Sequence, residues 1–301
     1  MFALLMASAL PAQAGVRASF AYTLAEGSGP MALSWPSLTW EPRSGELYVV
    51  DHSGGVIGVF NDSGMQVFSF GDDVAVGTPS GVVATENGEL FVLASIGSKW
   101  SVVRCNFRGE PVEKLLLKDV PTGFAELFTP SAIATAGGKL YLADKGAMKV
   151  LVIGLDGAFV SSQDLADLVK VDARKRIGLD IRGFAVDTTG NLLFTIPSLF
   201  TAYVVSPDGR VRSFGTKGGA PGKFNVVSGI AADENGNLFL TDLLRAVVMV
   251  FDKEFHFIGE FGYRGAEPEN LIAPADLVVG NRRVFVTQSV GGVKAFDILI
   301  N

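Results

Sequence analysis

The side chains that most often carry catalysis are scarce in this sequence. There are two histidines, His52 and His256, and one cysteine, Cys105. A metal site usually draws several His, Cys or carboxylate ligands together, whereas the two histidines occupy different positions of the repeat described below. Cys105 alternates with Val103 and Phe107, which is typical of a small side chain that faces a core. The sequence therefore predicts no metal site, no cofactor and no nucleophilic cysteine.

A set of mostly polar residues recurs where a short apolar strand begins. The set consists of Ser37, Ser80, Ser131, Arg182, Ser228 and Asp276. If these strands line a central channel, the residues gather at one mouth, where a single arginine among hydroxyl groups suits a carboxylate or another small anion. We therefore expect a small anionic ligand at this mouth, with Arg182 directed at it. The alternative is that the serines cap backbone groups at the crowded strand starts.

Three carboxylates, Asp51, Asp144 and Asp242, each end an apolar strand. Together they could surround one face of the molecule and hold calcium, which prefers oxygen ligands. Aspartate also commonly accepts hydrogen bonds from backbone N–H groups in the turn after its strand. This structural role is the one we expect.

A repeat that runs through the chain positions all these residues. A glycine or arginine followed by an apolar strand recurs near residues 45, 88, 138, 190, 236 and 282. The equivalent residues Leu47 and Val284 are five repeats apart, which gives a period of about 47 residues. Each repeat holds four short strands separated by turns such as the Asn-Gly pair at 235–236. Six such units predict an all-β fold, a six-bladed β-propeller of four-stranded antiparallel blades.

The repeat resembles the NHL repeat. The segment 227–242 carries almost the whole pattern Pro-x-Gly-Ile-Ala-x-Asp-x-x-Gly-Asn-Leu-Phe-x-x-Asp, and Arg245 extends the match. The resemblance covers residues 20–298 and is weaker in the second, fourth and sixth copies. It implies a single NHL-type propeller domain over residues 15–301, a fold that serves scaffolds, ligand binders and enzymes. The zinc site of the amidating-lyase relatives of this fold needs more histidines than this chain has, so we do not expect that activity.

The two ends of the chain are expected to meet in one blade. The sixth repeat stops after its third strand, which lies around residues 294–298. Residues 19–24, Ser-Phe-Ala-Tyr-Thr-Leu, match the fourth strand of the other repeats. We therefore expect the N-terminal strand to complete the last blade and close the ring.

Residues 1–14 predict export. An apolar run ends in Ala12-Gln13-Ala14, which is typical of a signal peptide and its small-residue cleavage site. Cleavage after Ala14 leaves the closing strand at 19–24 intact. The run is too short to span a membrane, and no later stretch is long and apolar enough to do so. We expect a periplasmic or extracellular protein.

The overall charge argues against one class of partner. The net charge is −6, and no cluster of Lys and Arg with interleaved aromatic residues is present, so we do not expect nucleic acid to bind. Because histidines are few, the sequence favours a non-enzymatic scaffold that binds a protein or peptide. The alternative is a metal-dependent propeller enzyme of the lactonase or lyase type.

Overall fold

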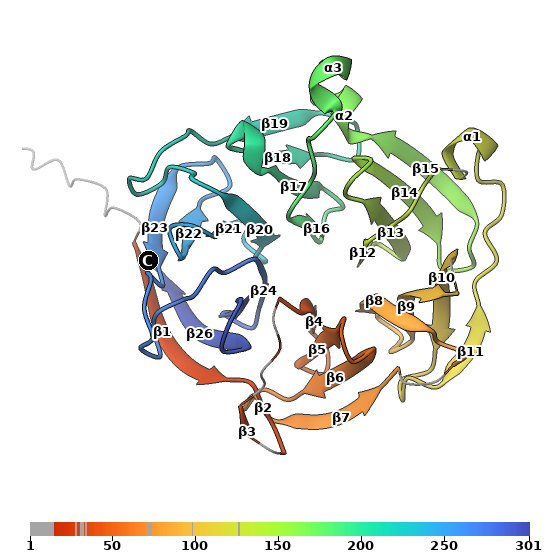
Figure 1. Ribbon diagram of the computed structural model, residues 1–301, viewed down its shortest axis with the longest axis horizontal. Helices are drawn as coiled ribbons and strands as arrows, with labels where there is room; N and C mark the ends of the chain where they lie inside the picture. The colour runs from red at the N-terminus through yellow and green to blue at the C-terminus, as the bar shows by residue number, and fades with distance from the viewer. Residues whose placement is uncertain are drawn as a thin grey trace, which may run out of the picture.

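The computed structural model describes residues 15–301 except 28, 31, 32, 34, 72, 73, 98 and 126. The signal peptide predicted for residues 1–14 lies outside these residues. In the described part of the chain, six four-stranded antiparallel sheets stand around a central axis (Figure 1). The predicted six-bladed β-propeller is therefore confirmed. None of the described helices has the length and apolar character that crossing a membrane requires.

The first three blades share one layout, in which the first strand lies nearest the axis and the fourth lies at the rim (Figure 1). Blade 1 contains β4 (Ser37–Glu41), β5 (Glu46–Asp51), β6 (Val56–Phe60) and β7 (Gln66–Phe70). Blade 2 contains β8 (Thr78–Ala84), β9 (Leu90–Ile96), β10 (Lys99–Cys105) and β11 (Pro111–Lys114). Blade 3 contains β12 (Ala132–Ala136), β13 (Lys139–Asp144), β14 (Lys149–Gly154) and β15 (Phe159–Asp164).

The remaining blades keep the same order from axis to rim. Blade 4 contains β16 (Phe184–Val186), β17 (Leu192–Ile196), β18 (Thr201–Val205) and β19 (Val211–Phe214). Blade 5 contains β20 (Val227–Ala232), β21 (Leu238–Asp242), β22 (Val247–Phe251) and β23 (Phe257–Phe261). Blade 6 contains β24 (Asp276–Gly280), β25 (Arg283–Thr287), β26 (Val293–Ile300) and β1 (Val16–Thr23). Short elements join the blades: β2 (Ala25–Glu26), β3 (Gly29–Pro30), α1 (Thr122–Ala125), α2 (Leu165–Leu168) and α3 (Ala173–Arg176). A 3-10 helix at Pro197–Leu199 connects β17 to β18 within blade 4.

The ring closes as the sequence predicts. Strand β1 is the outermost strand of blade 6 and pairs antiparallel with β26, with Phe20 opposite Phe296 and Thr23 opposite Lys294. The rings of Phe20 and Phe296 meet edge to face, 6.1 Å apart. A bulge between Phe20 and Tyr22 interrupts the pairing once. The pairing covers an edge of β26 that would otherwise expose unpaired backbone groups.

The apolar core is divided among the contacts between neighbouring blades. Each strand presents alternate side chains to its two faces, so each blade contributes to two clusters. On β21, for example, Phe239 packs with residues of blade 6, whereas Leu240 packs with residues of blade 4. A shift of one residue in any strand would exchange these two sets of side chains. The alternation therefore fixes both the register within a blade and the order of blades.

Buried threonines join adjacent blades close to the axis. The Oγ1 of Thr195, on β17, accepts a hydrogen bond from Gly183 N at 2.9 Å and donates one to the carbonyl oxygen of Ser228 in blade 5. Thr241 repeats this arrangement between blades 5 and 6, with Gly229 N as donor and Ala275 O as acceptor. Each hydroxyl therefore hydrogen-bonds one backbone N–H of its own blade and one backbone carbonyl of the next blade.

The same contacts require glycine on the inner strands. A Cβ added to Gly183 would lie 2.3 Å from the carbonyl oxygen of Ser228, and one added to Gly229 would lie 2.6 Å from Asp276 Cα. Both contacts are with neighbouring backbone, which cannot swing aside as a side chain can. The inner strands therefore approach each other as closely as their backbones allow.

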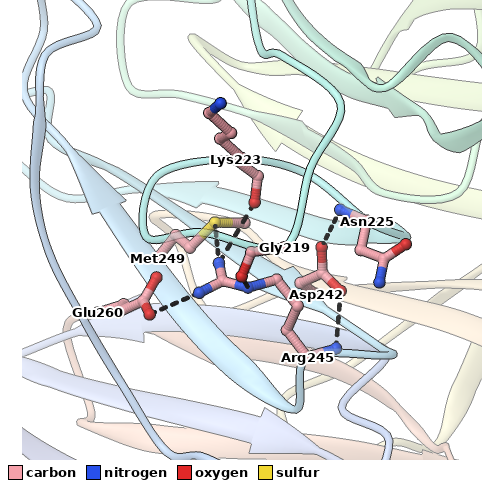
Figure 2. Close-up of polar contacts among 7 residues, drawn as sticks. All are labelled: Gly219, Lys223, Asn225, Asp242, Arg245, Met249 and Glu260. Atoms are coloured by element: carbon pink, nitrogen blue, oxygen red, sulfur yellow. Dashed lines mark hydrogen bonds and ion pairs between the residues drawn. The ribbon is translucent and has the colours of Figure 1, made fainter.

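A buried ion pair anchors the loop that leads into blade 5 (Figure 2). The guanidinium of Arg245 lies 2.6 Å from Glu260, and the two side chains are 9% and 6% exposed. Arg245 also donates to the carbonyl oxygens of Gly219 and Lys223, which belong to this loop. Asp242 accepts from the backbone N–H of Asn225 at 2.6 Å, just before β20. These bonds fix the path by which the chain reaches the axis.

Replacing Thr195 should test the contact between blades 4 and 5. Thr195→Val keeps the shape but leaves Gly183 N and Ser228 O without their partner, which should cost about 1–3 kcal/mol of unfolding free energy. Thr195→Ser keeps the hydroxyl and should lose less. Urea denaturation of the three proteins measures the difference. Equal stability of the valine and wild-type proteins would show that the hydroxyl does not join the blades.

Replacing Arg245 should expose the cost of an unpaired buried carboxylate. Arg245→Met leaves Glu260 without its cation and should lower the unfolding free energy by about 3–5 kcal/mol. The double variant Arg245→Met, Glu260→Leu removes both charges and should recover most of this loss. Arg210→Met, which removes a solvent-exposed pair with Asp208, is the control and should change little. A double variant as unstable as the single one would contradict this account.

Candidate functional site

One face of the propeller carries the starts of all six inner strands. Because each blade is an antiparallel meander, the second strand of each blade ends on this same face. The loops before the first strand and after the second strand therefore lie together, and we call this side of the molecule the inlet face. Figure 1 shows the inner strands β4, β8, β12, β16, β20 and β24 grouped around the axis.

The six residues predicted as a binding site all lie at or near these strand starts, in differing surroundings. Ser80 and Ser228 lie within β8 and β20, where Ser80 Oγ donates to the carbonyl oxygen of Leu93 at 3.2 Å and Ser228 is buried. Ser131 directly precedes β12 and is exposed. Ser37 begins β4 and Asp276 begins β24. A shared binding role for the six residues stays a prediction.

Arg182 lies two residues before β16 and is largely in solvent. Its side chain is 59% exposed, and its Nε lies 3.7 Å from a carboxylate oxygen of Asp180, which is also exposed. An exposed ion pair of this length holds its partners weakly. The guanidinium makes no other bond to the described residues, so it keeps donors for an anion. The predicted role of Arg182 as an anion ligand also stays a prediction.

The inlet face holds a hydroxyl paired with an imidazole. Ser37 Oγ lies 3.0 Å from Nε2 of His52, the residue that directly follows β5. The backbone of Pro79 lies on the same face and acts to raise the pKa of the imidazole slightly. Part of His52 is exposed. The protein atoms around the ring partly desolvate it, which disfavours the charged imidazolium and lowers the pKa of His52 below its ordinary value. Neutral imidazole is therefore favoured.

Two charged side chains from other blades also belong to the inlet face. Lys145 directly follows β13 in blade 3, and its ammonium lowers the pKa of both His52 and Asp276. Burial has the larger effect on Asp276 and raises the pKa of its carboxyl, whose Oδ1 accepts from Leu277 N at 2.9 Å. None of the described residues forms a hydrogen bond or ion pair with the Lys145 ammonium. We call Ser37, His52, Lys145 and Asp276 the inlet cluster.

Sequence reasoning placed Ser37 and Asp276 at the inlet face but missed His52 and Lys145. A signal for them exists in the repeat. His52 follows Asp51 at the end of the second strand of blade 1, and Lys145 follows Asp144 at the same point of blade 3. Aligning the residue after each second strand would have placed an imidazole and an ammonium at one position of the ring.

The aspartates that end second strands are used by the backbone, as expected. Asp144 accepts from Thr129 N and Ala147 N, both at 2.8 Å, and Asp242 accepts from three backbone N–H groups. No group of three or more His, Cys, Asp or Glu side chains in the described ranges is placed to hold a metal ion. The described His, Cys, Asp and Glu side chains therefore do not fit the alternative prediction of a metal-dependent lactonase or lyase.

Comparison with known proteins identifies the fold. No protein-family model matches the chain, and no curated protein matches it in sequence. Among solved structures, virginiamycin B lyase from Staphylococcus aureus superposes with a TM-score of 0.56 at 13% identity, over 87% of this chain and 80% of the lyase. A gluconolactonase from Xanthomonas campestris gives 0.58 at 16% identity, over 94% and 90% of the two chains. A luciferin-regenerating enzyme gives 0.59 at 13% identity, over 94% and 95%.

These neighbours correct the function expected from the sequence. The prediction of a non-enzymatic scaffold is wrong, because the solved propellers that the chain resembles include a lyase, a lactonase and a luciferin-regenerating enzyme. That prediction depended on the number of histidines that a metal site needs. A hydroxyl paired with an imidazole needs only one histidine, and His52 supplies it. The comparisons thus place the chain among six-bladed propeller proteins, several of which are enzymes.

Proposed function

We propose that the protein is a hydrolase that cleaves an ester or lactone at its inlet face, with Ser37 as the nucleophile and His52 as the general base. The observation that carries this proposal is the 3.0 Å contact between Ser37 Oγ and His52 Nε2. A hydroxyl within hydrogen-bond reach of a base, which a third group orients, is the arrangement that activates serine. A lactonase and a lyase among its structural neighbours support an enzymatic role for this fold.

The proposed chemistry requires one tautomer of His52. Nε2 faces Ser37 and must accept its proton, so the imidazole N–H must be on Nδ1. The lone pair of Nε2 is then free to accept the Ser37 proton. Asp51, the preceding residue, binds the N–H of Ser53 and is therefore occupied in its own turn. The proposed pair therefore lacks the carboxylate that completes a full triad.

The reaction would proceed in two steps. Ser37 Oγ attacks the carbonyl carbon while its proton passes to His52 Nε2. The bond to the leaving oxygen then breaks, and that oxygen takes the proton from His52, which leaves an acyl group on Ser37. In the second step His52 takes a proton from water, the resulting hydroxide displaces Ser37, and Ser37 regains its proton.

Lys145 supplies the positive charge that this sequence of steps needs. The carbonyl oxygen becomes negative in both tetrahedral intermediates, and a fixed cation nearby stabilises that charge. The ammonium of Lys145 is close enough to His52 to lower its pKa. It makes no hydrogen bond or ion pair with the described residues and so can face the substrate.

We make two further proposals, on the type of repeat and on the location of the protein. We propose that the repeats are of the NHL type, because the pattern at 227–242 continues into Arg245, whose buried ion pair organises blade 5. We also propose that the protein is exported, on the strength of the apolar run that ends at Ala12-Gln13-Ala14. Cleavage after Ala14 would leave β1, which begins at Val16, free to close the ring.

Removing either member of the pair should abolish hydrolysis. Ser37→Ala and His52→Gln should each lower kcat/KM by about a thousandfold on whichever lactone or ester the wild-type protein cleaves. A pH-indicator assay over a panel of simple lactones and esters measures this. His256→Gln, which changes the other histidine, is the matched control and should keep the wild-type rate. Wild-type protein inactive over the panel, or full activity in Ser37→Ala, would overturn the proposal.

The pH dependence should report the state of His52. Protonated imidazole cannot accept the serine proton, so kcat/KM should fall as the pH drops through the pKa of His52. Because removal of water from the ring lowers this pKa, the midpoint should lie below the ordinary value of about 6.5. Lys145→Gln removes a charge that lowers the same pKa, so its midpoint should move to higher pH. A midpoint above about 6.5 in the wild-type protein would contradict the assignment.

A further inference from the structure

An exposed tryptophan stands directly beside the inlet cluster. Trp35 lies two residues before Ser37, which limits the separation of their Cα atoms to about 7 Å. Its side chain is 48% exposed. The other two tryptophans are less exposed: Trp40 stacks on Phe285, and Trp100 donates its ring N–H to the carbonyl of Phe128. Trp35 therefore presents much of its ring to solvent within reach of a molecule bound at Ser37.

The protein holds this ring in place. The backbone N–H of Trp35 donates to the carbonyl of Gln288 at 3.1 Å, and its ring Nε1 donates to the carbonyl of Ala273 at 3.0 Å. Both acceptors belong to loops of blade 6. The φ of Trp35 is +48°, which a bulky residue rarely adopts. Since the only polar group of the side chain is already bonded to protein, the part left exposed is a fixed apolar surface.

The loops that hold Trp35 carry further apolar side chains. Ile272 precedes Ala273, Val290 lies two residues after Gln288, and both side chains are exposed. The two loops are tied together, because Ile272 N donates to the side chain of Gln288 at 3.0 Å. The blade 6 side of the inlet cluster is thus apolar and rigid, whereas the Lys145 side is cationic.

We infer that Trp35 is a platform on which the substrate stacks a flat aromatic ring, so that the substrate class is an aromatic ester or a lactone fused to an aromatic ring. This inference depends on the proposed hydrolytic function for the bond that is cleaved, but not for the binding of the ring. A planar aromatic group gains from stacking on a fixed indole. The short separation of Trp35 and Ser37 allows one small molecule to stack on the indole and to place its ester carbonyl at Ser37.

Matched probes with and without the aromatic ring test the platform. Dihydrocoumarin and δ-valerolactone share a six-membered lactone, and only the first carries a fused benzene ring. The wild-type protein should cleave dihydrocoumarin with the lower KM. Trp35→Leu should raise the KM for dihydrocoumarin about tenfold more than that for δ-valerolactone. Trp35→Phe should recover part of the difference. Leu244→Ala, which shortens an exposed apolar side chain on the blade 5 part of the inlet face, should leave both values unchanged.

Binding of uncleaved analogues separates this inference from the catalytic one. The corresponding lactams, 3,4-dihydro-2-quinolinone and δ-valerolactam, should be titrated against wild-type, Ser37→Ala and Trp35→Leu proteins by ligand-observed NMR. Preference for the aromatic lactam should persist in Ser37→Ala and disappear in Trp35→Leu. Equal binding of the two lactams, or an aromatic preference that survives Trp35→Leu, overturns the platform. Lactam preference together with undiminished lactone cleavage by Ser37→Ala would refute the catalytic proposal alone.

Discussion

The close approach of the inner strands is the constraint on which the rest of this molecule depends. Six short strands must fit around one axis, and in blades 4 to 6 they do so with glycines that leave no room for a side chain and threonines that bond two blades at once. These contacts lie where the apolar layers between blades end, so polar backbone groups would otherwise be buried without partners. Because these backbone groups form hydrogen bonds within the protein, the blades can approach each other closely at the axis.

That convergence also explains why a site can exist on the inlet face. Residues from blades 1, 3 and 6 are far apart in the sequence, and each lies at or next to the end of a strand. His52 and Lys145 directly follow such strands, and Ser37 and Asp276 begin them. The sheet fixes the backbone at the strand ends. Little additional conformational entropy is therefore lost when these side chains are held at a fixed separation. A serine and a histidine can then form a reactive pair because the fold holds them within hydrogen-bond distance.

The fold could be predicted from the sequence, because each blade is built from a contiguous segment and the same pattern recurs in every repeat. Turn glycines, alternating apolar residues and the match between residues 19–24 and other fourth strands all concern neighbouring parts of the chain. The site was readable only in part. Ser37 and Asp276 could be placed from the repeat, whereas the pairing of Ser37 with His52 depends on the register of β4 against β5 and on the turn that follows β5. The charge of Lys145 acts on Asp276 from another blade, and no spacing along the chain encodes that interaction.

The closing strand has a consequence for how the protein acquires its structure. Of the described strands, β1 comes first in the chain and its partner β26 comes last. Blades 1 to 5 can each form from contiguous sequence during synthesis, but blade 6 must wait for the last strand. The contact between the two ends spans nearly the whole chain, and such contacts form slowly because a long loop must close first. Until β26 is available, β1 has no partner strand in its blade, and its exposed edge can pair with other chains.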